Sequence, residues 1–214
     1  MRLFPAPAGR RRRTLNGMEV FTNWQTWQRA EPELRRLLPA STCDAVAAAV
    51  EFALPCHGDQ QRPTGAPYAE HLLEAVEVLV RGAGVTDPDV LCAAVLHDVV
   101  EDTPCTVEDV RAAFGDRVAG MVAWVTKPET AAGADRKASK EAYLKSLAGA
   151  PDDAILVKLA DRASNVQTLR NLAPEKQREY YAQTVRYIMP LAASRGGWWA
   201  LWYASWQEAH RDLA

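Results

Sequence analysis

Residues 91–106 read LCAAVLHDVVEDTPCT and place one histidine and three acids inside an otherwise apolar segment. Upstream, Asp87 suits the N-cap position of a helix and Pro88 its first helical position, where a missing amide proton costs nothing. Downstream, Pro104 has no amide proton and disfavours helix at the residue before it. The sequence therefore predicts a buried helix over 87–103.

The ionisable side chains of this predicted helix are His97, Asp98, Glu101 and Asp102. Burying them without partners costs free energy, and a metal ion is one partner that would offset that cost. On a helix, the adjacent His97 and Asp98 reach the same ion only if it lies over the edge between their two faces. Glu101 lies on the same side, one turn further on. A carboxylate there could act as a general base beside a metal, although a solvated helix end with a chance histidine would show the same pattern.

The composition indicates one domain with no bias towards nucleic acid or membrane. The chain has 214 residues, 48% of them hydrophobic, and a net charge of −2. This length suits a single domain with a sizeable core, and the balanced charge predicts neither nucleic-acid nor membrane binding. No apolar run is long enough to span a bilayer. The four cysteines are scattered, which predicts free thiols and a cytoplasmic location.

The N-terminal segment is basic. Arginines occupy positions 10–13 and no apolar segment follows them, so this segment does not resemble a secretory signal. We expect residues 1–18 to be a disordered tail, or an upstream extension for which Met18 is the start. Residues 19–214 are then a single domain.

The rest of the chain alternates helical patterns with short breaks rich in glycine, proline or polar residues. No alternating apolar stretch is long enough to predict a sheet, so we expect an all-α fold. Tryptophan repeats at helical spacing in the last predicted helix, which we interpret as a core or interface stripe. Besides 87–103, the predicted helices cover 22–38, 42–54, 67–81, 106–115, 118–125, 140–147, 152–172, 174–192 and 198–213.

A second polar group follows the periodicity of a helix. Asp161, Asn165 and Thr168 recur at i, i+4 and i+7, and Lys158 joins the same side. The pattern alone fits a binding site and a solvated face equally well.

The glycine- and proline-rich loop over 55–68 holds one histidine and one arginine. We interpret His57 as a structural histidine whose hydrogen bonds are satisfied by the loop backbone. The Arg62 guanidinium is suited to a phosphate or base contact, because it presents several donors in one plane.

A candidate metal site combines side chains from three predicted helices. His71, the His97-Asp98 pair and Asp161 supply two imidazoles and two carboxylates. This mixed nitrogen and oxygen set suits Mn²⁺, Fe²⁺ or Zn²⁺ with open positions for water.

Five short motifs occur in order along the chain: GAPYAEH at 65–71, AAVLHDVVEDT at 93–103, FG at 114–115, VTK at 125–127 and VKLADRASN at 157–165. Together they resemble the hydrolase domain of the RelA/SpoT family, within the HD superfamily of metal-dependent phosphohydrolases. The resemblance covers about 46–172, and no synthetase domain would fit in the remainder. The chain is therefore similar to the stand-alone small alarmone hydrolases.

The resemblance implies an HD-domain helical bundle with one Mn²⁺ site between helices, and a reaction that removes the 3′-pyrophosphate of ppGpp or pppGpp to give GDP or GTP. Glu101 and Asp102 would position or deprotonate the attacking water, and their spacing leaves open which of them is the base. The implied metal ligands are His71, His97, Asp98 and Asp161. The implied nucleotide-binding residues are Arg62, Lys158, Asn165 and Thr168.

Two departures from the family pattern bear on the choice of nucleotide. Pro63 stands where the family usually has a lysine, and Ala163-Ser164 stand where it often has Leu-His. We expect the smaller pair to widen or reshape the pocket, so the adenine alarmones ppApp and pppApp are also candidate substrates. The alternatives are a phosphatase acting on another nucleotide, such as NADPH or a deoxynucleotide, and a non-catalytic nucleotide sensor.

Overall fold

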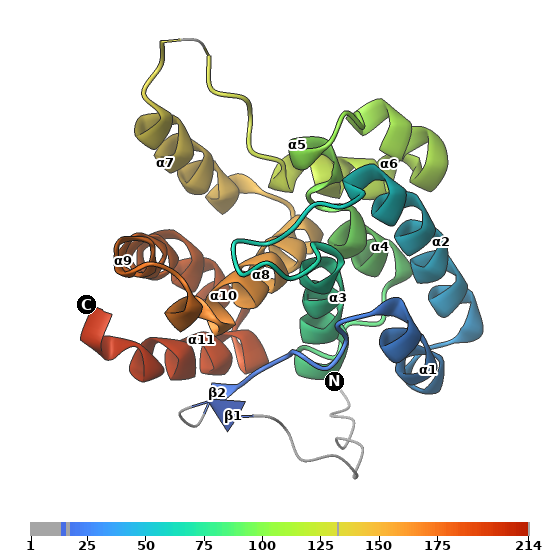
Figure 1. Ribbon diagram of the computed structural model, residues 1–214, viewed down its shortest axis with the longest axis horizontal. Helices are drawn as coiled ribbons and strands as arrows, with labels where there is room; N and C mark the ends of the chain where they lie inside the picture. The colour runs from blue at the N-terminus through green and yellow to red at the C-terminus, as the bar shows by residue number, and fades with distance from the viewer. Residues whose placement is uncertain (1–13, 16–17, 132, 214) are drawn as a thin grey trace.

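The computed structural model describes residues 14–15, 18–131 and 133–213, which form a bundle of helices as predicted (Figure 1). Most of the predicted tail over 1–18 lies outside the described residues. Two short strands, β1 (Thr14–Leu15) and β2 (Met18–Glu19), pair antiparallel at the start of the described chain. The Met18 side chain is buried in the core.

The helices of the described chain are α1 (Trp27–Leu37), α2 (Ala40–His57), α3 (Ala69–Glu77), α4 (Pro88–Leu96), α5 (Val99–Asp102), α6 (Val107–Val125), α7 (Arg136–Ser146), α8 (Asp152–Gln167), α9 (Pro174–Gln183), α10 (Met189–Arg195) and α11 (Gly197–Ala209). Two π-helical turns, Val78–Gly82 and Thr184–Ile188, extend α3 and α9. Short 3₁₀ turns lie at Leu147–Gly149, Leu169–Asn171 and Arg211–Leu213.

Helix α4 is the central element of the bundle. The Asp87 carboxylate accepts hydrogen bonds from the backbone amides of Asp89 (3.0 Å) and Val90 (3.3 Å), so the helix begins where the sequence predicts. Every residue over 90–96 is buried, and α4 packs against α2, α3, α6 and α8. Burial on all sides explains why its apolar residues run continuously instead of forming one stripe.

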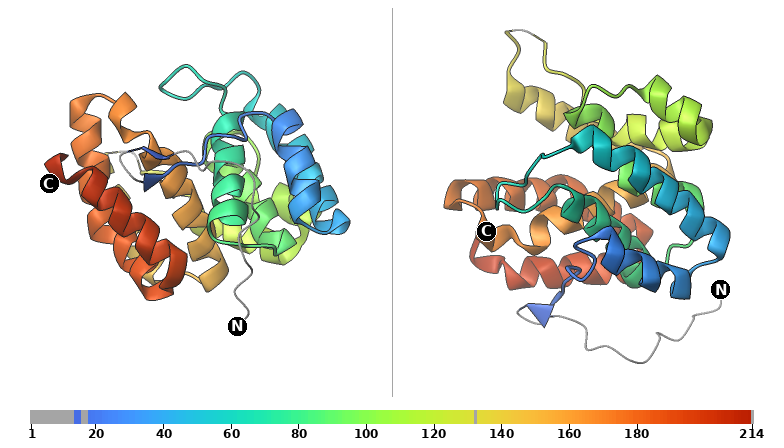
Figure 2. Two further views of the ribbon diagram at one scale, coloured as in Figure 1. Left: turned by 90° about the horizontal axis from the view of Figure 1, so that it is seen from below. Right: turned by 45° about the vertical axis from the view of Figure 1, so that its right-hand side comes forward.

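The remaining helices cover this centre from two sides. Helices α1 and α2 lie on one side, and α9, α10 and α11 lie on the other, with α3 and α8 between them (Figure 2). In α11, Trp206 Nε1 donates to the carbonyl of Val166 (3.0 Å) and the Tyr203 hydroxyl donates to the carbonyl of Leu159 (2.7 Å). The tryptophan stripe is therefore a core stripe. None of the described helices combines the length and the apolar character that crossing a membrane requires.

The helix predicted over 87–103 is interrupted at His97 and Asp98. Helix α4 ends at Leu96, and α5 is a separate single turn that begins after Asp98. Asp98 has φ −103° and ψ −2°, away from the values of a regular helix. The prediction of one continuous helix is wrong at the pair of residues that matters most for the site.

Other helix ends also differ from the prediction. Helix α2 continues through Pro55 to His57, because a proline in the last turn removes only one hydrogen bond. Helix α6 is an exception, because it is kinked at Gly115, whose φ of 83° is non-helical and favours glycine, so the break predicted there between two helices is confirmed. Helix α7 begins at Arg136, one turn earlier than predicted, and α8 ends at Gln167 instead of 172.

Candidate metal centre

Helices α3 and α8 and the junction after α4 bring together the four predicted metal ligands. His71 Nε2 lies 3.0 Å from His97 Nε2, 3.3 Å from Asp98 Oδ2 and 3.4 Å from Asp161 Oδ1. His97 Nε2 lies 3.0 Å from Asp98 Oδ2 and 3.7 Å from Asp161 Oδ1. His71, His97 and Asp98 thus form one group that could hold a metal ion, and Asp161 Oδ1 lies beside the two imidazoles of that group.

The helix break explains how adjacent residues join that group. On a continuous helix, His97 and Asp98 would face directions about 100° apart. Because α4 ends before them, the Asp98 carboxylate turns back towards the His97 imidazole. Sequence reasoning required the ion to lie over a helix edge, and the break removes that requirement.

The donor set fits a single divalent cation. Ligand atoms about 2.1 Å from one ion lie about 3.0 Å apart when adjacent ligands are at right angles. The five separations, from 3.0 to 3.7 Å, are close to this value. The residues His71, His97 and Asp161 are also buried, so they are held by their surroundings.

The carboxylates and imidazoles of this cluster are electrostatically coupled. Burial alone would lower the pKa of His71 and His97, but Asp98 and Asp161 outweigh it and raise both. Burial alone would raise the pKa of Asp98, but His97 and His71 outweigh it and hold that pKa well below its ordinary value. Burial acts in the same direction on Asp161, and Lys158 with the two imidazoles lowers its pKa well below the ordinary value. Both carboxylates are therefore anionic at neutral pH.

A tyrosine links this cluster to the predicted catalytic acids. The Tyr68 hydroxyl lies 2.5 Å from Asp98 Oδ2 and 2.9 Å from Asp102 Oδ2, and Gln60 Nε2 lies 3.5 Å from the same Asp102 oxygen. The His57 ring stacks on the Tyr68 ring with centroids 4.8 Å apart. The His57 Nδ1 contacts the Gln60 side chain (2.7 Å) and its Nε2 is buried without a hydrogen-bond partner, so the prediction of a histidine satisfied by loop backbone is wrong.

Glu101 has a different environment. Its Oε1 lies 2.5 Å from Lys127 Nζ, and its Oε2 accepts from the Lys127 backbone amide at 2.9 Å. Lys127 also lines a cavity of about 450 Å³ between the loop after α6 and helix α7, together with Glu129, Thr130, Arg136 and Lys140. Glu101 therefore lies next to a cavity whose lining is mostly basic.

The predicted nucleotide-binding residues fall into three places. Lys158 Nζ lies 2.7 Å from Asp161 Oδ2 and Asn165 Nδ2 donates to Asp161 Oδ1 at 2.6 Å, so both hold a metal-ligand candidate. Arg62 NH1 pairs with Glu74 at 2.9 Å. Thr168 follows the last residue of α8 with φ −111° and ψ 26°, so the helical spacing predicted for it is wrong.

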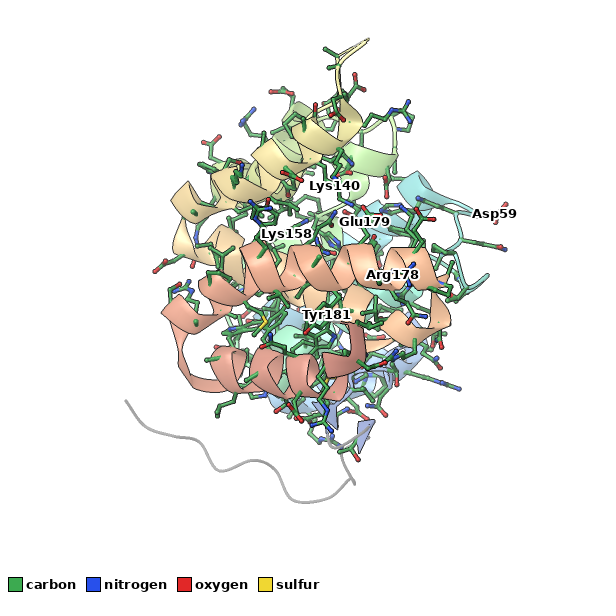
Figure 3. The ribbon with its side chains drawn as sticks, turned by 90° about the vertical axis from the view of Figure 1, so that its left-hand side faces the viewer. Asp59, Lys140, Lys158, Arg178, Glu179 and Tyr181 are labelled. Carbon is green, nitrogen blue, oxygen red and sulfur yellow. The ribbon has the colours of Figure 1, made fainter. Side chains whose placement is uncertain are left out.

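The buried Lys158 is labelled between α7 and α9 in Figure 3, where Lys140 of α7 and Glu179 of α9 are also labelled. Lys140 Nζ and Glu179 Oε1 form an ion pair at 2.9 Å between these two helices. The Lys140 and Lys176 ammonium groups lower the pKa of Glu179 to about 2. This ion pair connects α9 to α7, which carries part of the basic cavity.

The sequence pattern indicated no role for Tyr68 or Lys127, and for Ser164 it indicated only a change in the shape of the pocket. Both residues do lie inside the quoted motifs: Tyr68 is three residues before His71, and Lys127 is the last residue of the VTK motif. Their chemistry becomes visible only when the fold brings them to Asp98, Asp102 and Glu101. No spacing along the chain indicates those contacts.

The sequence profile of the HD domain matches residues 49–199, which is most of the chain. The chain therefore belongs to the HD domain family, and the resemblance drawn from its motifs is confirmed.

Among curated relatives, the guanosine-3′,5′-bis(diphosphate) 3′-pyrophosphohydrolase of Aquifex aeolicus is 37% identical over 174 residues, covering 78% of this chain and 24% of the relative. The bifunctional (p)ppGpp synthase/hydrolase SpoT of Escherichia coli is 35% identical over 166 residues, covering 76% and 23%. The chain thus spans about a quarter of the length of these relatives.

Among solved structures, a metazoan ortholog of SpoT, described as hydrolysing ppGpp, superposes with a TM-score of 0.71 and 27% identity. The match covers 82% of this chain and 98% of the ortholog. A protein from Listeria monocytogenes superposes with a TM-score of 0.54 and 24% identity, which shows a shared fold.

Proposed function

We propose that this protein is a Mn²⁺-dependent hydrolase that removes the 3′-pyrophosphate of ppGpp and pppGpp, giving GDP or GTP and pyrophosphate. The observation that carries the proposal is the cluster of two imidazoles and two carboxylates, with the Asp102 carboxylate one tyrosine hydroxyl away. The names of the relatives support the substrate, and the full-length match to the metazoan ortholog supports an active single domain.

His71, His97, Asp98 and Asp161 would hold the ion. We favour Mn²⁺ because nitrogen and oxygen ligands in equal number suit it, and because thiolate ligands, which favour Zn²⁺, are not part of this cluster. When bound, the ion would act as a Lewis acid that lowers the pKa of a water, so that the water can lose a proton at neutral pH. Lys158 and Asn165 hold the Asp161 carboxylate in place for that role.

Two carboxylates are candidates to accept the proton of the attacking water. Lys127 donates to both Glu101 oxygens, whereas the described contacts of Asp102 all fall on Oδ2. Tyr68 also ties Asp102 to Asp98, next to the ion. These contacts favour Asp102 as the base and Glu101 as the group that positions Lys127.

The substrate phosphates would lie towards the basic cavity. Its lining includes Lys127, Arg136 and Lys140, which suit a nucleotide with several phosphates. Arg62, half-buried against Glu74, keeps donors for a phosphate or base contact. Asn165 and Thr168 complete the proposed nucleotide-binding set at the end of α8.

The choice between guanine and adenine now depends on fewer residues. Ala163 and Ser164 are both fully buried, and Ser164 contacts His71, so their small size acts inside the core and not on a pocket wall. Pro63 is exposed in the loop before α3 and can still affect the base. We therefore keep ppApp and pppApp as further candidate substrates.

One assay separates the candidate functions. Purified protein with Mn²⁺ is offered ppGpp, pppGpp, ppApp, pppApp and NADPH, and the products are resolved by ion-exchange chromatography. Pyrophosphate release from the alarmones supports the proposal. Orthophosphate release from NADPH alone indicates a different phosphatase, and binding without turnover indicates a sensor.

Four free thiols also support a cytoplasmic location for this activity.

A further inference from the structure

A chain of hydrogen bonds between buried side chains starts on the side of His71 that faces away from the other proposed metal ligands. His71 Nδ1 lies 2.9 Å from Ser164 Oγ, and Ser164 Oγ lies 2.5 Å from Glu74 Oε2. Arg62 NH1 donates to the same Glu74 oxygen at 2.9 Å. Ser164 is fully buried and Glu74 is 3% exposed, so the chain is shielded from water. It connects the loop before α3 to a proposed ligand on α3 by way of α8.

The donors and acceptors of this chain are consistent with one direction only. His71 Nε2 faces the other ligands and must offer a lone pair to a cation, so its proton lies on Nδ1. Nδ1 then donates to Ser164 Oγ, and the Ser164 hydroxyl has its single proton left for Glu74. Glu74 accepts this proton and also accepts from Arg62. Each hydrogen in the chain therefore meets one acceptor.

The second imidazole is held differently. His97 Nδ1 lies 2.8 Å from the carbonyl of Ala94, in the last turn of its own helix. That contact is made by backbone and is independent of side-chain identity. His71 alone of the two depends on side chains from other elements, which makes its orientation sensitive to substitution.

We propose that Ser164 and Glu74 are positioning residues that fix His71 in the tautomer and orientation required for metal binding. The inference rests on the proposed metal site. It also gives a role to Ser164, which departs from the family pattern. The serine hydroxyl links the His71 imidazole to the Glu74 carboxylate by hydrogen bonds. Outer hydrogen-bond partners of this kind typically change metal affinity by about 10- to 100-fold when removed.

The alternative is that Glu74 and Arg62 only neutralise each other in the core. A simple ion pair would not require Ser164 and would not affect the ion. The two explanations therefore differ in what the Ser164→Ala substitution does to metal affinity.

The test measures the Mn²⁺ dissociation constant of the metal-free protein by titration, with free Mn²⁺ followed by electron paramagnetic resonance. The variants are Ser164→Ala and Glu74→Gln. Glu77→Gln is the matched control, because Glu77 is a fully buried carboxylate of the same helix that pairs with Arg81 at 2.6 Å. Ser194→Ala controls for loss of a helical serine hydroxyl, whose Oγ donates to the carbonyl of Leu191 at 2.8 Å.

We expect Ser164→Ala and Glu74→Gln to weaken Mn²⁺ binding by about 10- to 100-fold. The Mn²⁺ dissociation constants of both controls should stay within about threefold of the wild-type value, even if Glu77→Gln lowers the melting temperature. The proposal is overturned if Ser164→Ala binds Mn²⁺ like the controls, or if Glu77→Gln weakens binding as much as Glu74→Gln. Because no substrate is used, a wild-type protein that binds Mn²⁺ but leaves ppGpp intact would refute the proposed function and leave this comparison valid.

Discussion

Asp161 shows how single residues build the centre. Its Oδ2 is held by Lys158 Nζ at 2.7 Å and its Oδ1 by Asn165 Nδ2 at 2.6 Å, while Oδ1 also lies 3.4 Å from His71 Nε2. The Lys158 ammonium is buried, and burial alone would lower its pKa, but the Asp161 carboxylate raises that pKa above its ordinary value. The pair is therefore charged on both sides, and Asp161 is available as an anionic ligand.

The first prediction concerns the ligands. His71→Ala and Asp161→Ala each remove one donor and leave the remaining buried groups without a complete coordination sphere. We expect both variants to lose bound Mn²⁺ and all measurable turnover, as determined by metal analysis of the dialysed protein and by ppGpp hydrolysis. Asp116→Ala is the control, because that carboxylate is exposed and pairs only with Arg111 in the described contacts. Retention of metal and activity in either ligand variant would show that the assignment is wrong.

The second prediction concerns the two acids of α5. Glu101→Gln and Asp102→Asn keep the side-chain shape and remove the negative charge. A positioned general base typically contributes about 10²- to 10⁴-fold to the rate. We expect Asp102→Asn to lose activity by that factor and to keep its Mn²⁺, and Glu101→Gln to lose activity as its bond to Lys127 weakens. The test measures both the metal content and the turnover number of each variant. Loss of metal would show that the acids have a structural role. Near-normal turnover would show that they take no part in the mechanism.

At the scale of elements, the start of α4 could be predicted and its end could not. Asp87 and Pro88 are local signals, and the structure confirms both. The apolar pattern continues through Val95 and Val99, so nothing local marks a break between them. The break is tertiary, because the Asp98 carboxylate is bound by Tyr68, 30 residues away in sequence, and lies beside His71 of α3.

Helix α3 is tied to the N-terminal segment by a buried acid. The fully buried Glu77 accepts hydrogen bonds from the backbone amides of Asn23 (2.8 Å) and Trp24 (3.1 Å), and it pairs with Arg81. Gln167 at the end of α8 similarly bonds the backbone of Phe21 through both its oxygen (2.7 Å) and its nitrogen (2.9 Å). The segment before α1 therefore fastens the two helices that carry His71 and Asp161.

The third prediction follows from that buried acid. Glu77→Ala leaves two backbone amides, the Asn23 side-chain amide and the Arg81 guanidinium without this acceptor. Breaking a buried ion pair from one side typically costs about 3–5 kcal/mol, so we expect the free energy of unfolding to fall by about that amount. Urea denaturation followed by circular dichroism measures it. Glu108→Ala on the exposed side of α6 should change it by less than about 0.5 kcal/mol, and an equal effect of the two substitutions would contradict this role of Glu77.

At the scale of the whole molecule, the sequence could indicate the candidate ligand residues, which stay a prediction, but not the contacts that surround them. His71, His97, Asp98 and Asp161 come from short motifs whose order along the chain is visible in the sequence. The contacts of Tyr68, Lys127, Glu74 and Ser164 depend on the packing of α3, α4, α5 and α8, which no periodicity encodes. Thr168 was placed by assuming that α8 continues, and the helix ends one residue before it.

The fourth prediction concerns metal and global stability. A ligand that binds only the folded state stabilises it by about 2.7 kcal/mol at a concentration 100 times its dissociation constant. For a chain of this size, that corresponds to a rise in melting temperature of about 5–10 °C. We expect Mn²⁺ to raise the melting temperature of the wild type by that amount and excess chelator to reverse it. His97→Ala should abolish the difference, and an equal rise in that variant would indicate binding elsewhere.

The most direct test of the proposed reaction is the identity and amount of its products. Wild-type protein is freed of metal with a chelator, supplied with one equivalent of Mn²⁺ and incubated with ppGpp, and the products are quantified by ion-exchange chromatography. We predict no turnover before Mn²⁺ is added, and afterwards GDP and pyrophosphate in equal amounts. Release of orthophosphate in place of pyrophosphate, or equal rates with and without metal, would contradict a metal-dependent 3′-pyrophosphohydrolase.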